Sequence, residues 1–565
     1  MTLTPASSDQ DGKLDSLSMW NRFALVMAAT LIMGAGWGIR GSFGHSRGAM
    51  MPGAMLGLTL AVCSLRTDWR KRAAILGFLS AIGWGFNGAS SYGLLIGYSV
   101  GGSLENSAYG YACLFLIGAL YSGLGCSFLA IGLTKPRSFL DHAVIPMIVL
   151  YSLWLLEEFT GLKRWSIDLF AKDPATPNVS AWLYNSNWLN AATAIVVGTV
   201  AAIRTPGNRG AGWLMASLGL GWFAGMFVLV HLADLRINPP RHDAWAGCLG
   251  MQLALLGYFI IEKNRAAIML AGYGLVAGGY GFACGEFLQA LGRAEWGPIG
   301  SIAILKEFGA WTIMEQTFGY VMGFGTALAI ERLVQGRLAP PHEDSVARLL
   351  NPFCAFVLLG PLFAFNFLTN VGHWKEFKLI SERTLGIPTG YLLMAVVVMI
   401  LLLLATALYR QQMGTLDLAP KSPLGKSQLL ALLVIWMALA IYILLPRIGF
   451  PTSLMFFAAI GLGTLLILFL DKQSLSIKFQ SATPPESPLW TLGWKHWILW
   501  CAAPATIWGL ATLTMALKIP ITQFRFSKPE ATSRWELPRP RFGVDEWHPC
   551  ALAARSRDQP VSRSS

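Results

Sequence analysis

Apolar stretches of about twenty residues recur along this chain, separated by short polar connections. A helix of that length crosses a hydrocarbon core of about 30 Å, because each helical residue adds about 1.5 Å of length. The pattern therefore predicts an all-α polytopic membrane protein with about fifteen spans. The expected spans are residues 20–38, 48–65, 73–92, 109–133, 139–157, 187–203, 211–233, 244–261, 266–285, 310–331, 350–369, 388–409, 428–446, 450–470 and 494–517.

The membrane part of the chain reads as a direct repeat. Arg40, His45, Ala73-Ala74-Ile75, Gly85-Phe86 and Gly110-Tyr111 are followed, in the same order, by Arg236, His242, Ala266-Ala267-Ile268, Gly281-Phe282 and Gly319-Tyr320. Six spans in each copy is an even number, so both copies enter the membrane from the same side. The pattern predicts two parallel six-helix repeats plus about three extra C-terminal helices.

The expected organisation follows the hydrophobic pattern. It comprises a polar N-terminal tail (1–19), a first six-helix repeat (20–204), a second (205–410), appended C-terminal helices (411–517) and a disordered basic tail (518–565). The tail is assigned as disordered because its apolar runs stop and Pro, Arg and Ser dominate. The first apolar stretch lacks a small-residue cleavage signature, so we expect it to be a permanent helix.

Composition agrees with a bilayer environment. Hydrophobic residues make up 54% of the chain and charged residues 13%, against about 25% charged residues in soluble domains. The net charge of +13 raises the possibility of a nucleic-acid partner. The basic residues are dispersed over short connections, however, so we expect no nucleic-acid partner and instead contact with anionic lipid headgroups.

Basic residues in the short connections predict the orientation. By alternation, the connections on one side hold Arg66, Arg70, Lys71 and Arg72, then Lys135 and Arg137, Arg204 and Arg209, Lys263 and Arg265, and Arg332 and Arg337. That side is expected to be the cytoplasm, with the N-terminus there and the protein in the cell (inner) membrane. An odd number of spans would place the basic C-terminal tail outside, which conflicts with its charge and leaves the parity open.

The glycine-rich stretch between Gly34 and Gly48 is the first candidate site. Its glycines allow close backbone approach, and Arg40, His45 and Arg47 interrupt two apolar spans there. Arginine offers a planar fork for carboxylate or phosphate, so the stretch is a candidate anion cradle. The alternative is a short extramembrane turn whose arginines face water or headgroups.

The equivalent connection of the second copy holds further candidates. Arg236 and His242 are the counterparts of Arg40 and His45, and are predicted to contact the same solute. His231 and Asp234 lie one helical turn apart, where they could exchange a proton. The alternative is an ordinary polar loop with internally paired charges.

Glu286 is the candidate for proton or cation coupling. It follows a glycine-rich apolar segment, and a carboxylate at membrane depth costs about 2.5 kcal/mol or more. The alternative is that its span ends earlier and Glu286 lies in the interface. For three other acids we expect structural roles: Glu315 capping the start of its helix through the helix dipole, and Glu157 and Glu158 solvated.

Several enzyme classes lose support. The chain has no GxxxxGK[ST], HExxH or GxSxG motif and no His/Cys cluster with zinc spacing, so no metal or cofactor is expected. Its eight cysteines include no CxxC pair and are interpreted as packing residues.

Three functional hypotheses remain. The first is a transporter or permease for a small anionic solute, with its site between the two repeats. The second is a membrane-embedded transferase acting on a lipid-linked, acyl or glycosyl substrate, the only one of the three that would be an enzyme. The third is a structural or assembly subunit, in which the charged positions would be dispensable. The substrate, the direction, the coupling ion and the oligomeric state are not encoded in any motif of the chain.

Overall fold

The computed structural model describes most of the chain between Lys13 and Leu517. The described residues are 13–14, 17–40, 46–90, 92–100, 103–162, 165, 187–205, 209–233, 235, 237, 243–293, 309–341, 350–369, 371–376, 380–415, 450–471, 473–475 and 493–517. The expected span 428–446 and the predicted disordered tail 518–565 lie outside them.

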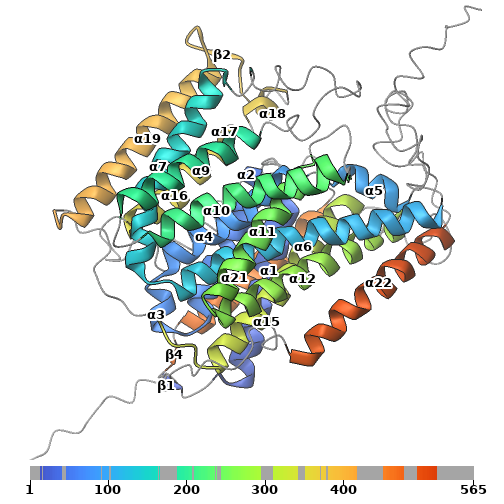
Figure 1. Ribbon diagram of the computed structural model, residues 1–565. Helices are drawn as coiled ribbons and strands as arrows, with labels where there is room; N and C mark the ends of the chain where they lie inside the picture. Colours follow the sequence, from blue (N-terminus) through green and yellow to red (C-terminus); the bar gives the residue numbers. More distant parts are fainter. Residues whose placement is uncertain are drawn as a thin grey trace, which may run out of the picture.

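The described chain is a bundle of helices (Figure 1). Its α-helices are α1 (Met19–Arg40), α2 (Ser46–Cys63), α3 (Thr67–Arg70), α4 (Ala73–Phe86), α5 (Gly93–Ser99), α6 (Leu104–Thr134), α7 (Arg137–Phe159), α9 (Asn187–Arg204), α10 (Gly210–Gly225), α11 (Ala244–Ile261), α12 (Arg265–Gly292), α15 (Ala310–Gln335), α16 (Leu350–Leu359), α17 (Pro361–Thr369), α18 (Val371–Glu376), α19 (Thr389–Gln412), α21 (Phe450–Asp471) and α22 (Gly493–Ala516). A 3₁₀ turn, η2 (Asn87–Ala89), follows α4, and a π-helix, η3 (Met226–Leu232), extends α10.

The strands of the described residues are short. β1 (Lys13–Leu14) pairs in parallel with β4 (Ser474–Leu475). β2 (Arg383–Thr384) pairs antiparallel with β3 (Ile387–Pro388) just before α19.

The helices fit a multi-pass membrane protein. Within the described residues, nine helices are long and apolar enough to cross a membrane, and shorter apolar helices accompany them. Every expected span that falls on described residues coincides with a helix or with two consecutive helical segments. The repeat itself stays a prediction.

Two close helix pairs form the centre of the bundle. α6 crosses α12 at Gly118 and Gly278, where a Cβ on either glycine would lie 2.0–2.1 Å from the carbonyl oxygen of the other. α1 packs on α15 in the same way, since a Cβ on Gly319 would lie 2.4 Å from the carbonyl oxygen of Met33. Small residues at such crossings let helix backbones approach closely, which drives helix association in membranes.

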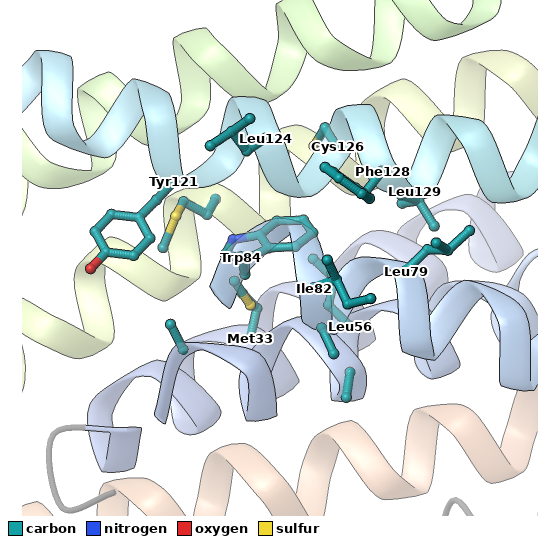
Figure 2. Packing of buried hydrophobic residues seen from close by; sticks show 14 of the residues in the cluster. Met33, Leu56, Leu79, Ile82, Trp84, Tyr121, Leu124, Cys126, Phe128 and Leu129 are labelled. Carbon is teal, nitrogen blue, oxygen red and sulfur yellow. The ribbon is translucent and has the colours of Figure 1, made fainter. Parts of the chain in front are cut away.

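The apolar core extends from this centre to α4 (Figure 2). Trp84 of α4 is fully buried and its ring lies against α6, where a Cβ on Gly125 would come within 2.1 Å of it. Leu79 and Ile82 continue this apolar face along α4 toward Phe128 and Leu129 of α6 (Figure 2).

Basic side chains join several helix ends at one end of the bundle. The Arg66 guanidinium donates to the Leu338 carbonyl, and the Arg72 guanidinium donates to the Gly132 and Lys135 carbonyls at the end of α6. We call this region, which holds the α2–α4, α6–α7 and α11–α12 connections and the end of α15, the basic end. These connections therefore lie on one side, as their alternation predicts, and the arginines also satisfy carbonyls left free by helix termini.

The two ends of the described chain lie at opposite ends of the bundle. Arg22, in the first turn of α1, forms an ion pair with Glu331 near the end of α15, at 2.5 Å. α22 ends beside the start of α6, where the Tyr111 and Thr514 hydroxyls are 2.7 Å apart. α1 therefore starts at the basic end, and Leu517 lies at the far end. This agrees with the placement that an odd number of spans implies.

Candidate functional site

The expected span 73–92 is interrupted inside the bundle. α4 starts at the basic end and stops at Phe86, about 20 Å along its axis. The Asn87 side chain ties this interruption to the bundle: it donates to the carbonyl of Ile117, in the middle of α6, at 2.9 Å, and accepts from the Ser90 hydroxyl at 2.7 Å. Non-helical backbone at this depth is tolerated only where protein or a cavity surrounds it.

Tyr92, at the end of this break, links Arg40 to Glu315. Arg40 is the last residue of α1 and is buried, and its Nη2 donates to the Tyr92 hydroxyl. The same hydroxyl donates to Glu315 Oε1 at 2.6 Å, and Arg40 Nη2 lies 3.5 Å from that oxygen. The three side chains thus form a buried cation–phenol–carboxylate chain across α1, the break and α15.

Glu315 is not a helix cap, so that prediction is wrong. α15 begins at Ala310 with Gly309 as its N-cap, and no acidic residue lies in its first turn. Glu315 is one turn further on and faces α1, where Arg40 provides a charged partner.

Three aromatic rings surround the Arg40 guanidinium. Its central carbon lies 4.7 Å from the ring centroid of Trp37, 5.1 Å from that of Tyr92 and 5.8 Å from that of Tyr121. Desolvated cation–π contacts are worth about 2 kcal/mol or more. Arg40 Nε and Nη1 have no hydrogen-bond partner among the described residues, so two donor positions remain for a further acceptor.

Glu286 occupies a second buried polar position. It is 0% exposed, and its Oε1 accepts a hydrogen bond from Ser99 Oγ at 2.7 Å. Its Oε2 and both amide atoms of Gln289, one turn later on α12, are buried and have no hydrogen-bond partner within the described part of the chain. Buried polar atoms of this kind are costly unless something else binds them.

The two positions lie in one region. Tyr92 immediately precedes α5 and Ser99 ends it, so the two anchors are about 10 Å apart along its axis. Phe282 of α12 and Phe318 of α15 stack with centroids 3.9 Å apart, and the Tyr92 ring packs on both. Gln316, next to Glu315 on α15, is also buried, and neither of its amide atoms has a hydrogen-bond partner among the described residues. We call the following set the central polar cluster: Arg40, Tyr92, Ser99, Glu286, Gln289, Glu315 and Gln316.

The structure describes the side chains of two of the predicted site residues, Arg40 and Glu286. The other predicted positions are outside this description: His45, Asp234, Arg236 and His242 are not among the described residues, and Arg47 and His231 are described only as backbone in α2 and η3.

Sequence reasoning missed the roles of Tyr92, Ser99 and Gln289. The sequence could have indicated a buried role for Glu315, because Glu315 is an acid inside a long, largely apolar helical stretch. Tyr92 had a weaker one, because it follows the polar break that begins at Asn87. The prediction that Glu157 is solvated is also wrong. α7 continues to Phe159, so Glu157 lies within the helix, and its side chain is buried.

A separate apolar cavity of about 550 Å³ is lined mainly by α4, α6, α7, α9 and α10, with further residues from α2, α11 and α16. None of the cluster residues lines it. Comparison with protein-family models, curated proteins and solved structures gave no match.

Proposed function

We propose that this chain is a multi-pass membrane transporter or permease for a small anionic solute, and that the central polar cluster is its site. The observation that carries the proposal is the state of Arg40: buried, caged by three rings, paired with one carboxylate, and with two donor nitrogens unpartnered among the described residues. Arginine in this state supports bidentate binding of a carboxylate or phosphate.

Glu315 gives this site a way to couple the solute to protons. The solute anion would bind Arg40 Nε and Nη1 while the Glu315 carboxylate lies near Nη2, so two negative charges would share the single positive charge of Arg40. A proton taken up from solution by the Glu315 carboxylate removes its charge and frees Arg40 for the anion. When the anion leaves, Glu315 releases the proton and pairs with Arg40 again, which makes anion and proton move together.

Glu286 is proposed as a second proton or cation position, because one of its oxygens is unpartnered among the described residues in the interior of the bundle. The remaining predicted residues stay part of the proposal. His45, Arg47, Arg236 and His242 would contact the solute, and His231 and Asp234 would move the proton.

The cluster's position supports a site between the two proposed repeats. Arg40, Tyr92 and Ser99 belong to the first half of the chain, and each of their bonds to Glu315 or Glu286 crosses to the second half. The break between α4 and α5 also resembles the discontinuous helices that form sites in transporters.

The packing of the halves supports the repeat only in part. α1 packs on α2 as α10 packs on α11, and α4 packs on α6 as α12 packs on α15. In contrast, α1 also packs along α15, whereas α10, its counterpart, packs mainly on α9 and α11.

A membrane-embedded transferase is the second candidate. The observation that favours it is the apolar cavity, whose wall reaches Gly85 and Phe86 just before the break. A lipid-linked substrate would place its chain in such a cavity and its reacting group near the polar residues. In the third hypothesis, a structural subunit, the same charged residues would be dispensable.

The side of the membrane from which a reagent reaches the central polar cluster distinguishes these candidates. Gln316→Cys, in a variant lacking the native cysteines, is treated with a membrane-impermeant maleimide in vesicles of both orientations. A transporter exposes the cluster alternately and is modified from both sides, whereas modification from one side only contradicts transport and favours the transferase. Thr67→Cys, exposed at the basic end, is the control that one side alone should modify.

Glu286→Gln tests the coupling role. The change removes the titratable group at nearly constant shape, so we expect loss of pH-driven uptake with exchange retained. Proteoliposomes with an imposed pH gradient are assayed with labelled acetate, succinate, phosphate and sulfate. Glu262→Gln, at the basic end, is the matched control and should behave as wild type. A pH profile that Glu286→Gln leaves unchanged contradicts the role.

A further inference from the structure

The apolar cavity offers almost nothing to a polar ligand. Its described lining contains no charged side chain, and Asn190 is its one amide side chain. Most of the rest is aliphatic or aromatic, including Phe78, Ile82 and Leu218. Burial of an unpaired polar group here would be costly, so the occupant has to be apolar along most of its length.

The cavity is elongated along the helices. Its lining on α7 runs from Phe139 to Trp154, about 22 Å, and its lining on α4 runs from Ile75 to Phe86, about 16 Å. One leaflet of a bilayer is about 15 Å of hydrocarbon, half of the roughly 30 Å core. The volume of about 550 Å³ also falls in the range of about 300–1,000 Å³ of ligand sites.

We propose that this cavity binds the acyl chain of a membrane phospholipid. A void of this size between packed helices would forfeit dispersion contacts, and acyl chains are the apolar molecules that surround the outer helices of the bundle. Asn190 lies in the first turn of α9, toward the end of the bundle opposite the basic end, and is the position for the polar end of the lipid. The chain would then run toward Phe139.

A single helix, α7, separates one side of the cavity from the surface of the bundle. α7 presents a largely unburied face, with Ile145 and Ile148 exposed, while other residues of the same helix line the cavity. The inner wall ends at Phe86, so the bound chain supports the end of α4 next to the break. The site is distinct from the proposed solute site, because no cluster residue lines it, and it does not depend on transport.

A photoreactive lipid tests the site. The purified protein is placed in phosphatidylcholine nanodiscs containing phosphatidylcholine with a diazirine in its acyl chain, irradiated, and its adducts are mapped by mass spectrometry. We expect adducts on Leu79 or Ile82 of α4. Both line the cavity and are only 7% and 6% exposed, so bulk lipid outside the bundle has almost no access to them.

Two substitutions of α9 give the matched comparison. Ala194→Trp fills the cavity and should lower the α4 adducts about tenfold, which corresponds to about 1.4 kcal/mol of binding free energy. Val196→Trp, on the outer face of the same helix and 61% exposed in the native residue, should leave them unchanged. Ala143→Phe, on the α7 side of the cavity, repeats the test if Ala194→Trp does not fold.

The proposal is overturned if adducts in the wild type are confined to outward residues such as Ile145 and Ile148. It is also overturned if filling the cavity leaves the α4 adducts at their wild-type level. Occupation of the cavity by another segment of the chain would give the first of these results.

Discussion

At the scale of single residues, Arg40 has a structural role beside the functional role proposed for it. Its charge is buried and has one described carboxylate partner, Glu315, with Tyr92 bonded to both. Removing one member of a buried ion pair costs about 3–5 kcal/mol, because an uncompensated charge stays behind, whereas replacing both by neutral groups is often close to neutral. Stability and activity should therefore respond differently to substitution of the pair.

Glu315→Gln should destabilise the protein by about 3–5 kcal/mol, because Arg40 keeps its charge without a carboxylate. The double variant Arg40→Met with Glu315→Gln should recover most of this loss and, because it lacks the cation, should take up no anions. Glu315→Gln alone keeps Arg40, so it should lose pH-driven uptake and retain anion exchange. Thermal unfolding in detergent and anion uptake in proteoliposomes measure the two effects.

The control for this pair is Glu262→Gln. Glu262 pairs with Lys135 at the basic end and its side chain is 33% exposed, so its loss should cost no more than about 1 kcal/mol. An Arg40–Glu315 double variant that is as unstable as Glu315→Gln, or that still transports anions, contradicts the assignment of Arg40.

At the scale of elements, the candidate site depends on where helices are interrupted and where they cross, more than on where each span begins and ends. The predicted spans 73–92 and 350–369 are both broken. Asn87 ends the first by bonding to α6. Pro361 separates α16 from α17 in the second, since proline begins a helix readily and cannot continue one. The first of these breaks places Tyr92 beside Arg40, so it forms part of the candidate site.

The glycine crossing of α6 and α12 holds the two halves of the chain together. Gly278→Val should lower the melting temperature strongly, with at least about 1–3 kcal/mol of overpacking cost, because its Cβ would overlap the carbonyl oxygen of Gly118. The same change at Gly257 of α11 meets open space within 4 Å among the described residues, so it should cost little. Equal effects of the two substitutions in thermal unfolding would contradict the role of the crossing.

At the scale of the whole molecule, the basic end organises the bundle. Arg66, Arg72 and Lys135 link the connections of different helix pairs there. These connections carry the positive charge that favours the cytoplasmic side. α22 ends at the opposite side, since Thr514 meets Tyr111 at the start of α6.

This arrangement predicts that Thr67→Cys is modified by an impermeant maleimide only from the cytoplasmic side. A single cysteine added after Ser565 should be modified only from the outside, because residues 518–565 contain no apolar run of about twenty residues. Labelling of intact cells and of inverted vesicles measures both. Modification of the two positions from the same side would contradict the path of α22 across the bundle.

The sequence by itself determined the membrane class, most of the helix bounds and the gathering of basic connections on one side. Each of these depends on local composition. An apolar run of sufficient length forms a span, and the connections between successive spans fall on alternate sides of the membrane. The tertiary structure decided which residues form the candidate site. Tyr92 and Glu315 are 223 positions apart, and Ser99 and Glu286 are 187 apart.

Such pairs leave no periodic signal in the chain, because their geometry arises only when α1, α5, α12 and α15 pack together. The apolar cavity has the same origin. Its walls come from several helices, each of which has an ordinary apolar sequence, and only their spacing leaves room between them.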